Sequence, residues 1–460
     1  MSSTSPNARS RRYRDIVAIL ILLLLACGFV GAQVAQSRPI SPVDEHVYVD
    51  ALLKFPQHPV IQRGELINDQ TRHLIDCHGM MFSRAPEPER CAGTQTAPLE
   101  SYPRESFSGV DIYTPIYVAV TWIASRPFVL AGLDTLSALR MAGAVWLAAA
   151  AILLYVATRR LGLDRMRGFA VGALLIGSVP AWWSATFVST DSALLTVGAG
   201  LVLAAIAWWQ RAVPSWLLCV LGLLAVWIKF QAVFIVGALA VALIWSAGAE
   251  WLRRRGLTRR MGMHARIGSH TRHLDDGFTE PTPRRYLWTA AGMAAAVLLA
   301  QVSWLLIRAV IPAAGPTPVS TGDVPTTGAL LSESGRFVWD LMAGSVPMEN
   351  MNPVSQVLAW AGSILLVVAA LVQLIIPAER PLRALAIGFW VAILTLGPLI
   401  ALSNILVEGY YFALPSRYAM ALVPLGLVFV AAILPRSRFF GAMLLLGGVT
   451  AAALSLGIGQ

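Results

Sequence analysis

The sequence predicts an all-α, polytopic membrane protein, and three observations support this prediction. Hydrophobic residues make up 57% of the 460-residue chain and charged residues only 13%, and the mean hydropathy is +0.65, a composition typical of helical membrane proteins. Apolar runs of about 17–25 residues, long enough to cross a bilayer as helices, recur along the chain. Basic residues gather at alternate ends of these runs, as the positive-inside rule requires of cytoplasmic segments.

The apolar runs predict a bundle of about eleven transmembrane helices. The run at residues 216–249 would make a helix of about 50 Å, too long for one crossing, so we expect the chain to turn near Lys229. The expected spans are residues 16–34, 136–158, 168–188, 192–209, the two halves of 216–249, and residues 286–311, 357–376, 384–406, 419–434 and 440–456.

The apolar run at residues 112–133 is predicted to lie along the membrane instead of crossing it. It is interrupted by Pro115, Arg126 and Pro127. If it crossed, the next helix would place the arginines of residues 159–167 outside, against the positive-inside rule. We therefore expect an interfacial helix against the outer leaflet, within a long first extracytoplasmic loop at residues 35–135.

This topology divides the chain into four parts: a cytoplasmic basic N-terminus (residues 1–15), a membrane module (16–249), a cytoplasmic basic loop (250–285) and a C-terminal transmembrane module (286–460) with an extracytoplasmic loop at 312–356. It assigns 22 of the 35 basic residues to the cytoplasmic side and 18 of the 25 acidic residues to the outer side. The net charge of +10 therefore reflects topology and indicates no nucleic-acid partner. We expect a multi-pass protein of a bacterial plasma membrane with a cytoplasmic N-terminus.

Charged residues near the ends of the spans are the candidates for chemistry. Asp44, Glu45 and His46 follow the first span, where charge is costly unless it is solvated or used. The topology gathers further polar residues at the outer ends: Asp111, Tyr113, Asp191, Lys229, Tyr411 and Arg417. The sequence contains neither the midplane carboxylates of ion-coupled transporters nor the phosphate-binding loop of nucleotide hydrolases. This pattern favours an active site at the outer membrane surface.

Two of the four cysteines, Cys77 and Cys91, share the first loop. If this loop faces an oxidising compartment, the two cysteines are expected to form a disulfide. Zinc binding by these cysteines together with His73 and His78 is the alternative, although their spacing fits no common zinc motif.

Six sequence features together carry a resemblance to a known class of enzymes. They are Asp44-Glu45 after the first span, the run from Asp111 to Tyr117, the apolar run from Leu136 to Gly162 that ends in Arg-Arg-Leu-Gly, Ser189-Thr190-Asp191, the run from Ile228 to Ala232, and Pro415-Ser416-Arg417-Tyr418. In this order they resemble the GT-C class of integral membrane glycosyltransferases. That class includes protein O-mannosyltransferases, aminoarabinose transferases, and the arabinofuranosyl- and mannosyltransferases of actinobacterial envelopes. The resemblance covers residues 16–234 and, more weakly, the C-terminal third.

The resemblance implies transfer of one sugar, arabinofuranose or mannose, from a polyprenyl-phosphate donor to an extracytoplasmic glycan, lipid or protein acceptor, with inversion. Asp44 would take the proton of the acceptor hydroxyl, with Glu45 as the second candidate or as its partner. Lys229, Arg417 and His46 would bind the donor phosphate. Sugar or acceptor binding would involve Asp191, Asp111, Tyr113 and Tyr411. No cofactor is implied with certainty, and a divalent cation stays open.

Each assignment has a structural alternative. Arg417 and the tyrosines could be interfacial anchors, and Lys229 could extend to the interface from a helical hairpin. Asp111 and Asp191 could cap helices. The main rival function is a transporter or flippase of lipid-linked glycans, which predicts a polar path through the bundle to the cytoplasmic side.

Overall fold

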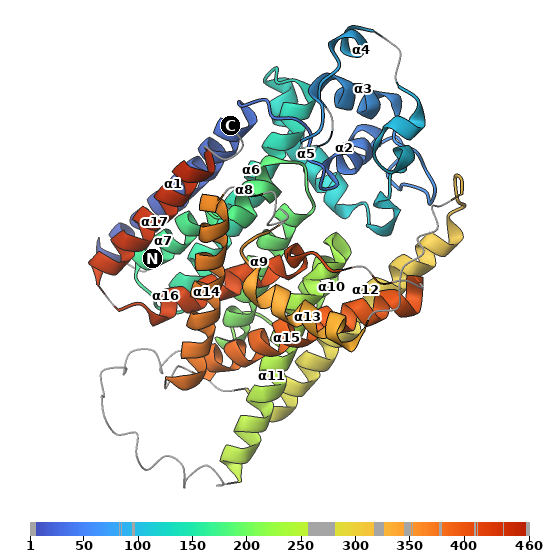
Figure 1. Cartoon of the computed structure of the whole chain (residues 1–460). Coiled ribbons are helices and arrows are strands. Elements are labelled where there is room, and N and C mark those ends of the chain that lie inside the picture. The colour runs from blue at the N-terminus through green and yellow to red at the C-terminus, as the bar shows by residue number, and fades with distance from the viewer. Residues whose placement is uncertain are drawn as a thin grey trace, which may run out of the picture.

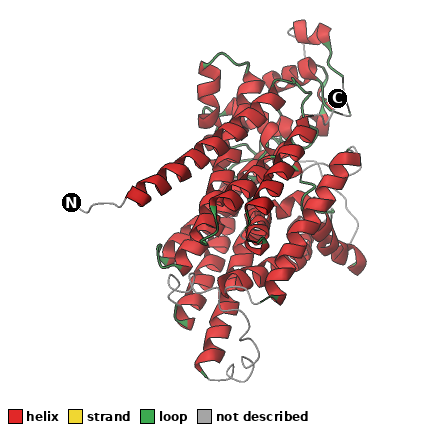
Figure 2. Ribbon diagram, turned by 90° about the vertical axis from the view of Figure 1, so that its left-hand side faces the viewer, coloured by secondary structure: helices red, strands yellow, loops and turns green. Residues whose placement is uncertain are grey.

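The computed structural model shows an all-helical protein, as the sequence predicts (Figure 1). It describes residues 6–456 apart from 82, 84, 94–96, 256–280, 317–325, 345–350, 352, 377–379, 409, 410, 412 and 436. Over these residues Figure 2 shows helices joined by loops, and β-structure is limited to two isolated bridges, Ile40 to Met80 and Leu66 to Phe107.

In the described ranges, eight helices are long and apolar enough to cross a bilayer, which identifies a multi-pass helical membrane protein. They lie at eight of the expected positions. They are α1 (Pro6–Val34), α6 (Thr135–Arg160), α9 (Asp191–Trp209), η4 and α11 (Phe230–Ala232 and Val233–Arg254), α12 (Pro283–Val310), α14 (Pro353–Ile375), α15 (Arg380–Glu408), and η7 with α16 (Ser416–Leu422 and Val423–Ile433).

The other three expected spans are helical but do not belong to these eight. The span expected at residues 168–188 consists of α7 (Arg165–Ile176) and α8 (Val179–Thr186), which meet at an angle of 58°. Pro180 cannot continue the first helix, and the Ser178 hydroxyl caps the second by accepting from the Ala181 amide at 3.3 Å. Helix α10 (Ser215–Ile228) has 14 residues and α17 (Arg438–Leu456) has 19. At about 21 Å, α10 is shorter than the hydrocarbon core.

Between α1 and α6 lies a long connection, residues 35–134, which we call the first loop. It contains α2 (Glu45–Lys54), α3 (Asp69–His78), α4 (Pro88–Ala92), the 3-10 turns η1 (Leu99–Ser101), η2 (Pro103–Ser106) and η3 (Val110–Ile112), and α5 (Ile116–Leu130). Figure 1 shows it in blue and cyan at one end of the bundle. Its apolar residues, among them Val47, Ile67 and Ile75, form one cluster with residues of α6 and α9 such as Leu139 and Ala193. Helix α5 is about 22 Å long, less than a bilayer core, and packs on α2 and α6.

The two ends of the bundle differ in charge. At the end opposite the first loop, the Asp15 carboxylate accepts from Tyr155 Oη at 2.6 Å and from Arg165 Nε at 2.7 Å. Arg167 Nη1 donates to the Leu434 carbonyl at 2.8 Å in the same region. These contacts join the ends of α1, α6, α7 and α16, so Arg159, Arg165 and Arg167, which were expected in cytoplasmic segments, lie together. We call this the basic end, and the opposite one the loop end.

Candidate active site

Four charged side chains form a continuous chain of contacts at the loop end. Arg417 Nη2 donates to Asp44 Oδ2 at 2.8 Å, and Arg417 Nε lies 3.8 Å from Asp191 Oδ2. Lys229 Nζ donates to Asp191 Oδ1 and, at 2.8 Å, to Thr190 Oγ1. Two carboxylates therefore alternate with two cations, and their formal charges cancel. We call these four residues the charge chain.

Burial divides the charge chain into an open half and a closed half. The side chains of Asp44 and Arg417 are 15% and 12% exposed, whereas those of Asp191 and Lys229 are 1% exposed. Removal of one partner of a fully buried ion pair strongly destabilises the folded protein, because the other charge then lies alone in a medium of low dielectric constant. An incoming ligand can therefore replace the contact between Asp44 and Arg417 at a lower cost in free energy than the contact between Asp191 and Lys229.

Each member of the charge chain comes from a different element. Asp44 precedes α2 with φ +61°, a left-handed conformation uncommon outside glycine, and its side chain makes no capping hydrogen bond. Asp191 is the first residue of α9, and Arg417 is the second of η7. Lys229 has extended backbone between α10 and η4, with φ −157° and ψ 126°. The turn expected near Lys229 is thus present, and it directs the ammonium inward.

Three structural alternatives from the sequence are wrong. Asp191 does not cap a helix, because Thr190 occupies the N-cap position of α9 and the Asp191 carboxylate binds Lys229. Asp111 lies inside η3, and its carboxylate accepts from Arg308 Nη2 at 2.6 Å, so it is not a helix cap either. The ammonium of Lys229 does not reach the lipid–water boundary, because the side chain is 1% exposed.

Tyrosines surround the closed half of the charge chain. The hydroxyls of Tyr48 and Thr190 are hydrogen-bonded at 3.1 Å, and Lys229 Nζ lies 5.8 Å from the centre of the Tyr113 ring. The rings of Tyr48 and Tyr113 are 5.8 Å apart. Burial raises the pKa of both phenols above the ordinary value, so both stay protonated donors. Sequence reasoning singled out Tyr113 but missed Tyr48 and Thr190, although Tyr48 follows Asp44 by one helical turn.

Glu45 lies apart from the charge chain, and its geometry does not support a role as base or as partner of Asp44. Its Oε1 and Oε2 accept from Arg140 Nε at 2.8 Å and Nη2 at 2.9 Å, and the side chain is fully buried. The amides of Ser41 and Val188 also donate to it, at 2.7 and 3.0 Å. Glu45 thus ties the first loop to α6 and to the segment before α9.

Two further predicted site residues have other surroundings. His46 is on α2 and is 2% exposed. The Tyr411 hydroxyl donates to Oε1 of Glu333, a buried residue of α13 (Thr327–Trp339), which also accepts from the Leu414 amide at 3.1 Å. Tyr411 therefore anchors the segment that leads to Arg417. The role of Glu333 was missed, since nothing in the sequence relates it to residues 411–414.

Cys77 of α3 and Cys91 of α4 form the expected disulfide, with an Sγ–Sγ distance of 2.07 Å. His73 Nε2 lies 3.6 Å from Cys77 Sγ. Over the described ranges, these three residues are the one group of three potential ligand side chains that converges, with the ligand atoms within 4.8 Å of one another. The sulfurs are bonded to each other, so the structure shows a covalent link between α3 and α4 where the alternative was a zinc site.

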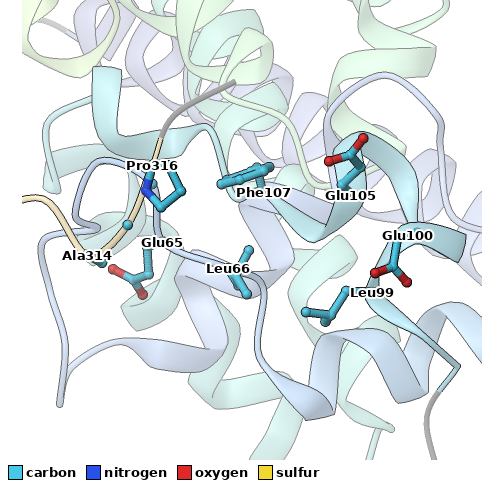
Figure 3. Close-up of a pocket in the computed structure, with 10 residues that line it drawn as sticks. Glu65, Leu66, Leu99, Glu100, Glu105, Phe107, Ala314 and Pro316 are labelled. Carbon is cyan, nitrogen blue, oxygen red and sulfur yellow. The ribbon is translucent and has the colours of Figure 1, made fainter. Parts of the chain in front are cut away.

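A hollow of about 420 Å³ opens on the first loop, away from the charge chain. Figure 3 shows the carboxylates of Glu100 and Glu105 on one side and Glu65 on the other, around Leu66 and Phe107. Residues 314–316, which follow α12, close one wall. None of the site residues predicted from the sequence lines it.

Comparison of the chain with protein-family models, with curated proteins and with solved structures finds no match. The resemblance to GT-C enzymes therefore stays an expectation from sequence motifs.

Proposed function

We propose that the protein is a membrane glycosyltransferase that moves a single sugar from a polyprenyl-phosphate donor to an extracytoplasmic acceptor. The observation that carries this proposal is the contact of Asp44 with Arg417 in the open half of the charge chain. It places a carboxylate, which can take a proton, beside a guanidinium, which can bind a phosphate through two parallel hydrogen bonds.

The two residues can act in sequence on one donor. A donor phosphate that binds Arg417 competes with the Asp44 carboxylate for the same nitrogen atoms. Its arrival would release Asp44 to accept the proton of an acceptor hydroxyl while that oxygen attacks the anomeric carbon. The bond between the anomeric carbon and the phosphate oxygen breaks, its electron pair stays on that oxygen, and Arg417 stabilises the negative charge of the leaving phosphate. Arabinofuranose and mannose are the sugars that the motifs favour.

Lys229 has a different role in this proposal from the one expected. It is closed off and already bound to Asp191 and Thr190. It would hold Asp191 in position, and Asp191 in turn helps to orient the guanidinium of Arg417 through Nε, whereas Asp44 binds Nη2. Because the carboxylates of Asp44 and Asp191 are neutralised by these cations, a divalent cation would have to displace one of them.

A transporter would need a polar path through the bundle. In the eight candidate spans, which the structure describes throughout, every charged residue lies within about two helical turns of an end of its span. The buried interior between the ends is mostly aliphatic and aromatic, with Val30, Leu147 and Leu195 as examples, and its polar members, such as Ser363, are uncharged. This arrangement supports chemistry at one end of the bundle in preference to transport through it.

The proposal places the loop end outside the cell and the basic end in the cytoplasm of a bacterium. It rests on the arginines gathered at the basic end, as the positive-inside rule requires. A disulfide in the first loop fits the same orientation, because disulfides persist in oxidising compartments.

The test is a transfer assay with purified protein, radiolabelled decaprenyl-phosphate arabinofuranose or mannose, and a glycan acceptor fraction. Asp44→Asn, which is isosteric, is expected to lower turnover about 10²- to 10⁴-fold, the usual contribution of a general base. Asp134→Asn is the matched control: it makes the same change at the loop end, and asparagine still caps α6. Equal activity of Asp44→Asn and wild type would refute the proposal, as would the absence of transfer by wild type with either donor.

A further inference from the structure

Arg38, in the link between α1 and α2, is a buried arginine with an unusual environment. It is 8% exposed, and its Nε and Nη2 donate to Gln36 Oε1 at 2.9 and 2.5 Å. In the part of the chain that the structure describes, its Nη1 has no hydrogen-bond acceptor and no carboxylate pairs with the guanidinium. Buried charges in proteins are normally paired. Among the described residues, the surroundings of Arg38 therefore lack an anion.

A second buried donor lies beside it. Trp182 of α8 is 2% exposed, and its Nε1 also has no acceptor among the described residues. The guanidinium carbon of Arg38 lies 5.3 Å from the centre of the Trp182 ring, so the two side chains that carry the unused donors are neighbours. A positive group and a neutral N–H donor that lie together are complementary to an oxyanion, which can accept from both.

The neighbouring charges do not neutralise Arg38. Arg140 donates through Nη1 and Nη2 to the carbonyls of Arg38 and Pro39, at 2.8 and 3.0 Å. Its own charge is balanced by Glu45, which it binds through two nitrogens. The region formed by Arg38, Arg140 and Glu45 therefore has a net charge of +1.

The position of Arg38 along the chain indicates where an anion would come from. The apolar window of α1 ends at Val34, and the residues between it and Arg38 are exposed. A residue four positions beyond the end of a span lies at the depth of the phospholipid head groups. The most abundant oxyanion at that depth is the lipid phosphate.

We propose that Arg38 and Trp182 form a binding site for a phosphate group, carried by a lipid head group of the leaflet at the loop end. This site is separate from the contact of Asp44 with Arg417 and does not depend on the proposed transferase activity. Arg140 and Glu45 link it to that contact, because Arg140 binds the carbonyls of Arg38 and Pro39 and also the carboxylate of Glu45, the residue after Asp44.

The test uses the full-length protein in dodecyl maltoside, a detergent without phosphate. The thermal unfolding midpoint is measured without addition, with phosphatidylglycerol and with inorganic phosphate. The variants are Arg38→Gln, Trp182→Phe, which keeps the ring but removes the donor, and Arg126→Gln as the matched control. Arg126 is a partly exposed arginine of α5 that binds only neutral groups, the Trp122 carbonyl and the Ser125 hydroxyl.

Phosphatidylglycerol is expected to raise the midpoint of wild type and Arg126→Gln, to raise that of Trp182→Phe less, and to leave that of Arg38→Gln unchanged. Without phosphate, Arg38→Gln is expected to be at least as stable as wild type, because the variant removes an unpaired buried charge. If inorganic phosphate alone reproduces the shift, the site binds a phosphate ion from solution, and the assignment to a lipid head group is wrong. If Arg38→Gln lowers the midpoint equally with and without phosphatidylglycerol, Arg38 is a packing residue and the proposal is wrong.

Discussion

Arg417 Nη2 lies 2.8 Å from Asp44 Oδ2, although 373 residues separate the two along the chain. Local structure cannot bring them together, since Asp44 precedes α2 and Arg417 belongs to η7 near the end of the bundle. Their contact depends on η7 packing against α9 and α11. The open half of the charge chain therefore forms only when the N-terminal and C-terminal parts of the bundle are assembled, and its function can be tested through either residue.

Two substitutions of Arg417 are expected to distinguish the effect of its positive charge from the effect of its planar shape. Arg417→Lys keeps the positive charge but loses the planar group that binds phosphate through two nitrogens, whereas Arg417→Gln loses both. We expect KM for the donor to rise in Arg417→Lys and kcat/KM to fall further in Arg417→Gln. Steady-state kinetics with varied donor concentration checks this. An unchanged donor KM in both variants would assign Arg417 to structure alone.

Glu45 is expected to matter for stability. Glu45→Gln leaves the buried guanidinium of Arg140 without its carboxylate, which typically costs about 3–5 kcal/mol. The double variant Glu45→Gln/Arg140→Met removes both charges and is expected to recover part of this loss. Thermal unfolding in detergent provides the measurement. A Glu45→Gln protein that unfolds at the wild-type temperature but transfers no sugar would contradict this and restore Glu45 as a candidate base.

The stability of the first loop is expected to fall in acid because of Glu65. Burial acts to raise the pKa of Glu65, but hydrogen bonds from Lys54, the Gln62 amide and His58 outweigh it, so the pKa lies below its ordinary value. A lowered carboxyl pKa stabilises the fold above the pKa of the unfolded chain, and this contribution disappears as the pH falls below that value. Hydrogen exchange of α2 and α3 between about pH 6 and pH 3 checks this. Glu65→Gln should flatten the profile, and an equally steep profile would exclude Glu65 as the cause.

Most of the helices could be predicted from the sequence, because span length and apolar content depend on local composition. The long runs that became α1, α6, α9 and α12 are examples. The break between α7 and α8 was missed, although Ser178 and Pro180 signal it, because the apolar run continues through both helices. Whether α5 lies along the membrane stays a prediction.

Part of the charge chain could also be predicted, because charged residues are scarce near the ends of the spans. Asp44, Asp191, Lys229 and Arg417 were each expected at the loop end. Their pairing was not predictable. Adjacent residues of a helix point about 100° apart, so whether Asp44 or Glu45 meets Arg417 depends on where α2 begins. Judged from the sequence alone, Arg140, which is 95 residues from Glu45, could have paired with Asp44 as well as with Glu45.

Removal of the disulfide is expected to loosen α3 and α4 while leaving the transmembrane bundle intact. The bond joins Cys77 and Cys91 across 14 positions, and closing a loop of this length typically stabilises a fold by about 3 kcal/mol. Cys77→Ser/Cys91→Ser should therefore speed hydrogen exchange and proteolysis at residues 69–92, with less effect on α6 and α9, which lie outside the segment that the disulfide closes. Cys27→Ser/Cys219→Ser is the control, since both cysteines are free thiols. If the two double variants exchange at the same rate in α3 and α4, the disulfide does not stabilise the first loop.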